Sequence, residues 1–231
     1  MYSFSPILSQ ALFRKGGEQQ LDSWITEPLS DADFKKVPDN RALAEMTRCV
    51  FQAGFVWKVI ERKWPDFEKV FFGFEPHKLV LLNPAQLDRI CADKRIVRNR
   101  QKIVSVPQNA AYILDLSKRF GSFSHFASQW RGDDYIGLCL NMKKFGCRLG
   151  GLTGPRILRK LGKDGFMLTN DVVTCLKATG LEIANNPTSK SDLMKIQNCF
   201  NAWQEQTGFS LTRLSKICAC ATGKNYPMPV G

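Results

Sequence analysis

Apolar residues recur at steps of three and four positions along one long segment of the chain. Between residues 41 and 64 they stand at Leu43, Met46, Val50, Ala53 and Trp57. This spacing gives a helix one apolar stripe, and Asp39 can accept hydrogen bonds from its first amides. Pro65 has no amide hydrogen and ends or kinks a helix. The pattern therefore predicts a single helix that Asp39 caps and that runs to Pro65.

The same periodicity predicts helices along most of the remaining chain. In the segment 190–207, Leu193, Ile196, Phe200 and Trp203 form one apolar stripe, and Gly208 is a natural helix end. Further helices are predicted at about 66–72, 76–82, 84–92, 96–115, 119–127, 134–146, 155–163, 169–179 and 211–219. Sustained alternation of apolar and polar residues is missing from the sequence, so the predicted fold class is all-α.

The predicted loops lie around residues 16–17, 121–124 and 185–190. None of them is long enough to be a flexible domain linker. With 231 residues, the chain is long enough for one substantial core or for two lobes that share an interface. We therefore expect a single compact domain over residues 1–231.

Charge is the unusual feature of the composition. Lysine and arginine outnumber aspartate and glutamate by 33 to 21, which gives a formal net charge of +12. This excess favours a polyanionic partner such as nucleic acid, and an anionic membrane surface is the competing interpretation. The sequence lacks the roughly 18 apolar residues in a row that a spanning helix needs and the features of a secretory signal. We therefore expect a soluble, cytoplasmic protein, associated with the nucleoid if its source is bacterial.

Eight cysteines are scattered through the predicted helices. They stand at positions 49, 91, 139, 147, 175, 199, 218 and 220. These spacings form no disulfide framework. The sequence therefore predicts free, mostly buried thiols in a reducing compartment.

A basic segment without acidic residues covers positions 142–163. In its middle, Gly150, Gly151 and Gly154 allow a tight turn whose amides can approach a ligand closely, just before a helix begins. The partial positive charge of a helix N-terminus adds to the attraction for a phosphate group. Arg148 and Arg156 flank this turn. The segment is typical of a DNA-binding helix-hairpin-helix, and the alternative is an ordinary helical turn with a solvated basic face.

A second basic stretch runs from Asp93 to Ile103. Arg95, Arg98 and Lys102 would share one face of the helix predicted at 96–115 and its continuation. Such a face can follow DNA phosphates or simply contact water. We predict that Arg98 and Lys102 bind DNA.

Four motifs occur in a fixed order between Glu45 and Leu114. They are Gln52-Ala53-Gly54-Phe55-Val56-Trp57, Phe72-Gly73-Phe74-Glu75-Pro76, Ile96-Val97-Arg98-Asn99-Arg100-Gln101-Lys102-Ile103 and Asn109-Ala110. This region resembles the 3-methyladenine DNA glycosylase I family, which belongs to the helix-hairpin-helix glycosylase superfamily. There the motifs are approximately Q-A-G-L-S-W, F-x-x-F-D-P, I-I-R-x-R-x-K-I and N-A. A weaker likeness continues at residues 143–151 and 170–173.

The resemblance implies a two-lobed, all-α helix-hairpin-helix glycosylase fold with a base-binding pocket between the lobes. It also implies an enzyme that hydrolyses the N-glycosidic bond of a methylated purine and so starts base excision repair. Its partner would be double-stranded DNA with a damaged base, and we expect it to act as a monomer.

The resemblance places Trp57 at the position of the family's pocket tryptophan. Extruding a nucleotide from the duplex costs a few kcal/mol, and stacking on an aromatic ring recovers about 1–3 kcal/mol. A purine methylated at N3 is a cation, which an indole face attracts, and it leaves as a neutral molecule. Gln52, Cys49 and Phe55 would form the pocket wall beside Trp57. From the residues alone, core packing is the alternative for Trp57, and a structural role for Gln52.

The sequence departs from the family at two places. The family's pocket glutamate falls at Cys49 or Val50, and a neutral thiol cannot supply the same charge. This sequence also lacks ligands for the structural zinc of the family, because Val172 stands where a histidine is expected. His77 and His125 have no ligand-like spacing, and two nearby cysteines leave two ligands unnamed. We predict no metal and no cofactor.

Two carboxylates are candidates for the catalytic group. Glu45 precedes Cys49 by one helical turn, and Asp171 stands where many helix-hairpin-helix glycosylases have an aspartate after the hairpin. The alternative for Asp171 is a favourable position at a helix N-terminus. Near the start of the chain, Tyr2, Phe4 and Trp24 either close the base pocket or anchor the N-terminal segment.

Three functional hypotheses follow. The first is a metal-independent DNA glycosylase for an alkylated purine, with 3-methyladenine as the expected base. The second is a protein that binds damaged DNA without cutting it, since the family's glutamate and metal ligands are replaced. The third is a glycosylase for a different, neutral or bulkier lesion that uses Asp171.

Overall fold

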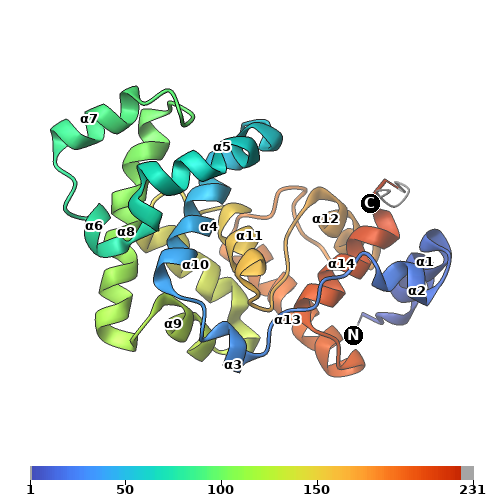
Figure 1. Cartoon of the computed structure of the whole chain (residues 1–231). Helices are drawn as coiled ribbons and strands as arrows, with labels where there is room; N and C mark the ends of the chain where they lie inside the picture. The colour runs from blue at the N-terminus through green and yellow to red at the C-terminus, as the bar shows by residue number, and fades with distance from the viewer. Residues whose placement is uncertain (1, 225–231) are drawn as a thin grey trace. The chain divides into compact units, whose positions relative to one another are not determined.

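The computed structural model describes residues 2–224, in which all regular structure is helical (Figure 1). The predicted all-α fold class is therefore confirmed. None of the helices in this part of the chain is both long and apolar enough to cross a membrane.

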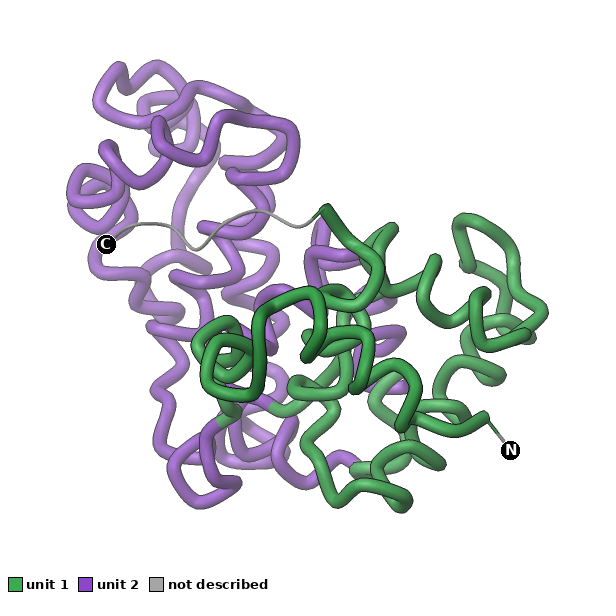
Figure 2. The backbone as a smooth tube through the Cα atoms, turned by 90° about the vertical axis from the view of Figure 1, so that its right-hand side faces the viewer, with its two compact units in different colours: residues 1–28, 131–136, 164–231 green, residues 29–130, 137–163 purple. Residues whose placement is uncertain are grey.

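The chain divides into two compact units (Figure 2). Among the described residues, unit 1 comprises 2–28, 131–136 and 164–224, and unit 2 comprises 29–130 and 137–163. Helix α10 (Tyr135–Phe145) begins in unit 1 and continues in unit 2. The prediction of a single domain with a base pocket between two lobes stays a prediction.

Unit 1 is built around its last helix. Its elements are α1 (Ser5–Lys15), α2 (Glu18–Asp22), the 3₁₀ turn η2 (Gly132–Asp134), α12 (Asn170–Ala178), α13 (Lys190–Thr207) and α14 (Leu211–Thr222). Helices α1, α12 and α13 all pack against α14. In the core, the rings of Phe166 and Phe200 stack with their centroids 4.2 Å apart.

The N-terminal residues are attached to α13. The indole of Trp203 donates a hydrogen bond to the carbonyl of Tyr2 (3.0 Å), and its ring lies 5.2 Å from that of buried Phe4. The hydroxyl of Tyr2 donates to the carbonyl of Gly180 (3.4 Å). These contacts support the anchoring alternative for Tyr2 and Phe4.

Unit 2 is organised around α4 (Asp39–Gln52), which packs on α8, α9 and α11. Its other elements are α3 (Asp31–Phe34), α5 (Trp57–Val70), η1 (Phe72–Phe74), α6 (Pro76–Leu79), α7 (Pro84–Ala92), α8 (Arg100–Phe120), α9 (Phe123–Gln129) and α11 (Thr153–Leu161). Leu43, Met46 and Phe51 of α4 are fully buried. Trp64 of α5 stacks on Phe67 and Phe74 in a neighbouring aromatic cluster.

The structure corrects the long helix predicted from Asp39 to Pro65. Helix α4 ends at Gln52, and α5 begins at Trp57, after a turn in which Gly54 has a φ of +76°. Pro65 lies inside α5 instead of ending it. The apolar spacing continues across the turn through Ala53 and Trp57, although both residues are exposed there. Periodicity alone therefore does not reveal the break.

Asp39 also has a different role from the predicted one. It is the first residue of α4, after Pro38 at the N-cap position. Its carboxylate accepts hydrogen bonds from the Phe123 amide (2.8 Å) and from the Ser117 hydroxyl. The side chain therefore joins α4 to the last turn of α8 and the first residue of α9.

Other helix boundaries differ in how well the sequence predicted them. The helices at 84–92 and 190–207 have the predicted bounds, whereas α1, α2 and α3 were not predicted. Helix α8 begins only at Arg100, where the Asn99 side chain accepts a hydrogen bond from the Lys102 amide. The predicted helical face of Arg95, Arg98 and Lys102 is therefore wrong, because the two arginines precede the helix.

Candidate functional site

The turn between α4 and α5 presents three large apolar side chains to solvent. We call residues 53–57 the aromatic turn. Phe55 is 39% exposed, Val56 67% and Trp57 47%. An exposed indole cannot be explained by core packing, which was the alternative reading of Trp57. The aromatic turn therefore offers rings that a flat ligand can contact.

Lys102 holds the aromatic turn in place. Its ammonium donates hydrogen bonds to the carbonyls of Phe51 (3.2 Å) and Ala53, at the C-terminal end of α4. It also lies 4.3 Å from the centroid of the Phe55 ring. Burial, together with the charge of Arg148, lowers the pKa of Lys102. Lys102 is itself buried, so it supports the turn instead of forming the predicted DNA surface.

Replacing Lys102 with Met should destabilise unit 2. The variant keeps most of the side-chain volume but leaves the last carbonyls of α4 without their charged donor, at a cost of about 1.5 kcal/mol. We expect this decrease in the free energy of unfolding in urea titrations. Arg98→Met removes an exposed cation nearby and serves as the control, with almost no change expected. Equal stability of the two variants would contradict this role for Lys102.

Helix α11 supplies a cation to the aromatic turn. The guanidinium carbon of Arg156 lies 4.9 Å from the centroid of the Trp57 ring, a cation–π distance. Because α11 packs on α4, the helix that follows the hairpin turn is fixed beside Trp57. A basic group and an exposed indole are thus brought together within unit 2.

Five side chains from α4, α5 and α11 form a closed ring of polar contacts. We call it the polar ring: Glu45, Arg48, Gln52, Glu61 and Lys160. Arg48 pairs with Glu45 (3.3 Å) and Glu61 (3.4 Å), and the Gln52 amide donates to Glu61 (2.7 Å). Lys160 closes the ring with contacts to Glu45 (3.7 Å) and to the Gln52 amide oxygen (3.5 Å).

Cys49 lies beside the polar ring and is fully buried. Burial raises the pKa of its thiol to about 12, with the positive charges of Lys160, Arg156 and Arg48 acting in the opposite direction. The thiol is therefore neutral at physiological pH. Gln52 is only 2% exposed. Both side chains are thus covered, and a base-pocket wall formed by Cys49 and Gln52 stays a prediction.

The sequence did not predict three members of the polar ring. Arg48 follows Glu45 at helical spacing, so its pairing could have been inferred from the sequence. Glu61 and Lys160 come from α5 and α11, and only the packing of three helices brings them together. Glu45, a predicted catalytic residue, is held between Arg48 and Lys160.

The basic segment folds as a helical hairpin made by α10, residues 146–152 and α11. Gly154 is buried, and a Cβ atom there would lie only 2.7 Å from the Leu149 carbonyl oxygen. Gly151 has a φ of +59°, which favours glycine. The Thr153 amide donates to the Gly150 carbonyl (3.2 Å). Of the three glycines predicted to form the turn, Gly151 adopts a turn conformation, whereas Gly154 lies inside α11 and allows close packing.

The basic residues predicted to bind DNA differ in their surroundings. Arg148 is exposed on the hairpin and hydrogen-bonds to Gln101 of α8. Arg98 is exposed before α8. Lys143 and Lys144, at the end of α10, are also exposed. DNA contacts by these side chains, and by Gly150, Gly151 and Arg156, stay predictions.

The remaining predicted site residues belong to unit 1. Asp171 is exposed in the first turn of α12, whose N-cap is Thr169. Its main-chain carbonyl accepts a hydrogen bond from Thr222 (2.7 Å). Trp24 has the Lys15 ammonium 4.2 Å from its ring centroid. Tyr2, Trp24 and Asp171 stay predictions as base-pocket or catalytic residues.

The side chains of the described residues do not fit the zinc site that the resemblance implies. Within residues 2–224, no group of three or more His, Cys, Asp or Glu side chains could hold a metal ion. Val172, at the expected position of a histidine, is a buried apolar residue of α12.

The all-helical fold is similar to the folds of solved DNA glycosylases. An 8-oxoguanine glycosylase/lyase from Methanocaldococcus jannaschii, solved with a 15mer DNA containing 8-oxoguanine, aligns with a TM-score of 0.53 and 17% identity, over 95% of this chain and 99% of that chain. A variant of 3-methyladenine DNA glycosylase I from Staphylococcus aureus aligns with a TM-score of 0.50 and 20% identity, over 67% of this chain and 91% of that chain.

The sequence model of the methyladenine glycosylase family matches residues 35–183, more than half of the chain. The chain belongs to this family. The DNA-3-methyladenine glycosylase 1 of Escherichia coli (strain K12) is 29% identical over 90 residues, which cover 38% of this chain and 48% of that protein. The match thus spans about half the length of this curated relative.

Proposed function

We propose that this protein is a DNA glycosylase that removes an alkylated purine, with 3-methyladenine as the expected base. The observation that supports this most directly is the exposed indole of Trp57 beside Arg156, in a chain that belongs to the methyladenine glycosylase family. The partner is double-stranded DNA with a damaged base, bound by a monomer without a cofactor.

Each part of the site has a task in this reaction. The hairpin and its exposed lysines contact the phosphates, while the aromatic turn contacts bases once the damaged nucleotide leaves the stack. Stacking on Trp57 returns about 1–3 kcal/mol of the cost of flipping. Apolar side chains such as Phe55 and Val56 are suited to contact unstacked neighbouring bases.

The bond to be broken needs little acid catalysis when the base is a cation. A 3-methylated adenine leaves as a neutral molecule as the C1′–N9 bond breaks, and water then adds to the sugar. Glu45 and Asp171 are the carboxylates that we propose to stabilise the positive charge that develops on the sugar. Glu45 contacts Lys160, which follows Arg156 by one helical turn on α11.

The proposal is tested by incubating the purified protein with duplex DNA that contains 3-methyladenine and measuring the free base by chromatography. Duplexes with 7-methylguanine, hypoxanthine or 8-oxoguanine define the range of lesions. We expect release of 3-methyladenine and none from undamaged DNA. If every alkylated purine stays attached at high enzyme concentration, the proposed activity is wrong.

Binding of damaged DNA without cleavage is a second candidate function. The neutral, buried Cys49 favours it, because the family's glutamate is replaced there and both nearby carboxylates are paired with cations. In this case the protein would bind a 3-methyladenine duplex more tightly than undamaged DNA, and no free base would appear at any enzyme concentration.

Asp171→Asn distinguishes the glycosylase for a neutral lesion from the glycosylase for a cationic one. A neutral leaving base needs more help at the sugar, so loss of the carboxylate should lower its excision by about 100-fold. Excision of 3-methyladenine should fall less. The measurement is single-turnover excision of both bases by both proteins, and equal effects would remove Asp171 from the explanation of specificity.

A further inference from the structure

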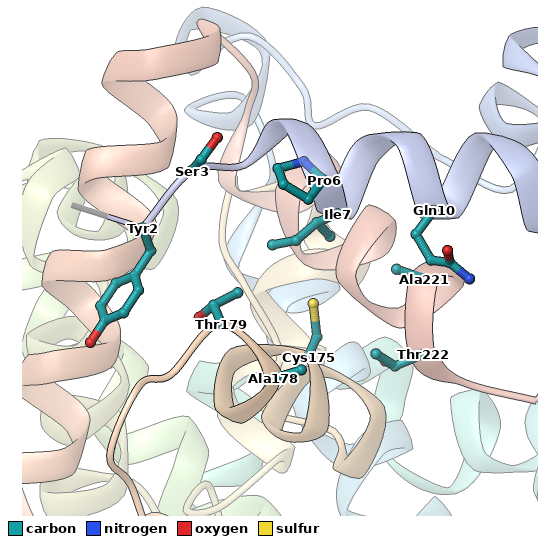
Figure 3. Close-up of a pocket in the computed structure, with 10 residues that line it drawn as sticks. All are labelled: Tyr2, Ser3, Pro6, Ile7, Gln10, Cys175, Ala178, Thr179, Ala221 and Thr222. Carbon is teal, nitrogen blue, oxygen red and sulfur yellow. The ribbon is translucent and has the colours of Figure 1, made fainter.

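Positive charge is concentrated in unit 2. Of the 33 lysines and arginines of the chain, 24 belong to unit 2, which has only 11 of the 21 acidic residues. Unit 1 has the other nine basic and ten acidic residues, and its cavity of about 390 Å³ is lined by the uncharged residues that Figure 3 labels. The attraction for DNA phosphates therefore acts on unit 2.

Two arginines of unit 2 lie over tryptophan rings, in different surroundings. The guanidinium carbon of Arg48 is 4.1 Å from the ring centroid of Trp64, which is 8% exposed, and Arg48 also pairs with both glutamates of the polar ring. Arg156 lies 4.9 Å from the ring centroid of Trp57, which is 47% exposed. Within residues 2–224, no hydrogen bond or ion pair engages the Arg156 guanidinium. The Arg156 contact is thus the one that can be exchanged without breaking an ion pair.

A flipped methylated purine needs the ring surface that Arg156 covers. A guanidinium group is flat and cationic, as the methylated purine in DNA is, and the electron-rich face of an indole attracts both. While the guanidinium lies over the Trp57 ring, a base cannot stack on that face. Stacking there therefore requires the Arg156 side chain to move away.

Arg156 lies where a DNA phosphate can attract it. It is the fourth residue of α11 and so belongs to the first turn of the helix that follows the hairpin. The positive end of this helix and the exposed side chains of Lys143, Lys144 and Arg148 attract phosphates to the hairpin. A phosphate offers the guanidinium two acceptor oxygens, which form a stronger contact than an exposed indole does.

We propose that Arg156 covers the Trp57 ring in the protein without DNA and exchanges the indole for a phosphate when DNA binds. This inference rests on the proposed stacking of the damaged base on Trp57. The exchange makes Arg156 a specificity-determining residue, because the ring becomes available to a base only when DNA is bound. The protein therefore prefers a methylated purine that is part of DNA to the same base free in solution.

The test measures binding of free 3-methyladenine, without cleavage. Isothermal titration calorimetry gives its affinity for the full-length protein alone and for the complex with a duplex that contains a tetrahydrofuran abasic site, where the place of the base is vacant. Without DNA, Arg156→Gln should bind the free base about threefold more tightly than the wild type, because the competing cation is gone. With the duplex, the two proteins should bind the free base equally tightly.

The phosphate contact has its own measurement. In Arg156→Gln, the slope of the logarithm of duplex affinity against the logarithm of salt concentration should fall by about one. Arg148→Gln is the matched control, because it removes a cation of the hairpin that does not lie over Trp57. This variant should also bind the duplex more weakly, but it should bind the free base without DNA as the wild type does. Circular dichroism verifies that both variants are folded.

The exchange is overturned if folded Arg156→Gln binds the free base without DNA no more tightly than the wild type, or if its salt dependence is unchanged. Absence of measurable binding of the free base in both proteins also overturns it. Excision by the wild type decides the proposed glycosylase activity separately. Excision together with unchanged binding in Arg156→Gln would refute the exchange alone, whereas the expected binding results without excision would refute only the glycosylase.

Discussion

Replacement of Trp57 by Ala is expected to lower the single-turnover excision of 3-methyladenine by about 30-fold. The indole is half exposed at the start of α5 and has Arg156 beside it. A stacked base gains about 1–3 kcal/mol from such a ring, and 2 kcal/mol corresponds to about 30-fold in rate. Because the ring is exposed, its removal should change the free energy of unfolding very little.

Trp57→Phe and Phe72→Ala are the matched variants for this test. Phe keeps a smaller stacking surface and should retain most of the activity. Phe72 is a second half-exposed aromatic residue of unit 2, outside the aromatic turn, so its removal should leave excision unchanged. Affinity for undamaged DNA should also be preserved in Trp57→Ala, since phosphates are contacted elsewhere. A wild-type excision rate in this variant would refute stacking on Trp57.

The sequence predicted the helical class well and the break in its central segment poorly. The apolar periodicity of the sequence runs through Ala53 and Trp57, which are exposed at the break, and α4 and α5 bury other apolar residues on either side of it. The break at residues 53–56 depends on Lys102, whose ammonium bonds to the end of α4 from a position 49 residues later than Ala53. Because Lys102 is so distant in sequence from the carbonyls that it hydrogen-bonds, no local sequence pattern marks the end of α4.

Only part of the candidate site was predicted, because some of its contacts also join residues that are distant in the sequence. The motif around Trp57 identified the exposed indole, and glycine spacing identified the hairpin. The polar ring was missed because α11 supplies Lys160 to Gln52, which is 108 residues earlier in the chain. The sequence also could not predict the solvent exposure of Cys49, Gln52 and Lys102, because side chains of these types occur both on surfaces and in interiors. Their burial follows from helix packing.

Cys49→Glu should shift the preference of the protein toward cationic bases. In the wild type, the neutral thiol lies near three cations, Arg48, Arg156 and Lys160, whereas the neighbouring carboxylates are only Glu45 and Glu61. This wall therefore has an excess of positive charge, which opposes a cationic base stacked beside Arg156. A glutamate at position 49 would cancel the excess.

The expected result is an increase of about tenfold in the ratio of 3-methyladenine excision to hypoxanthine excision. Two unit charges about 8 Å apart interact by about 2 kcal/mol at an effective dielectric constant of 20, and partial solvation reduces this to roughly 1.4 kcal/mol. Lys160 makes only long contacts to Glu45 and Gln52, so it can turn toward the new carboxylate. Cys49→Gln has the same size without the charge and should leave the ratio unchanged. An unaltered ratio in a folded Cys49→Glu protein would mean that this wall does not face the base.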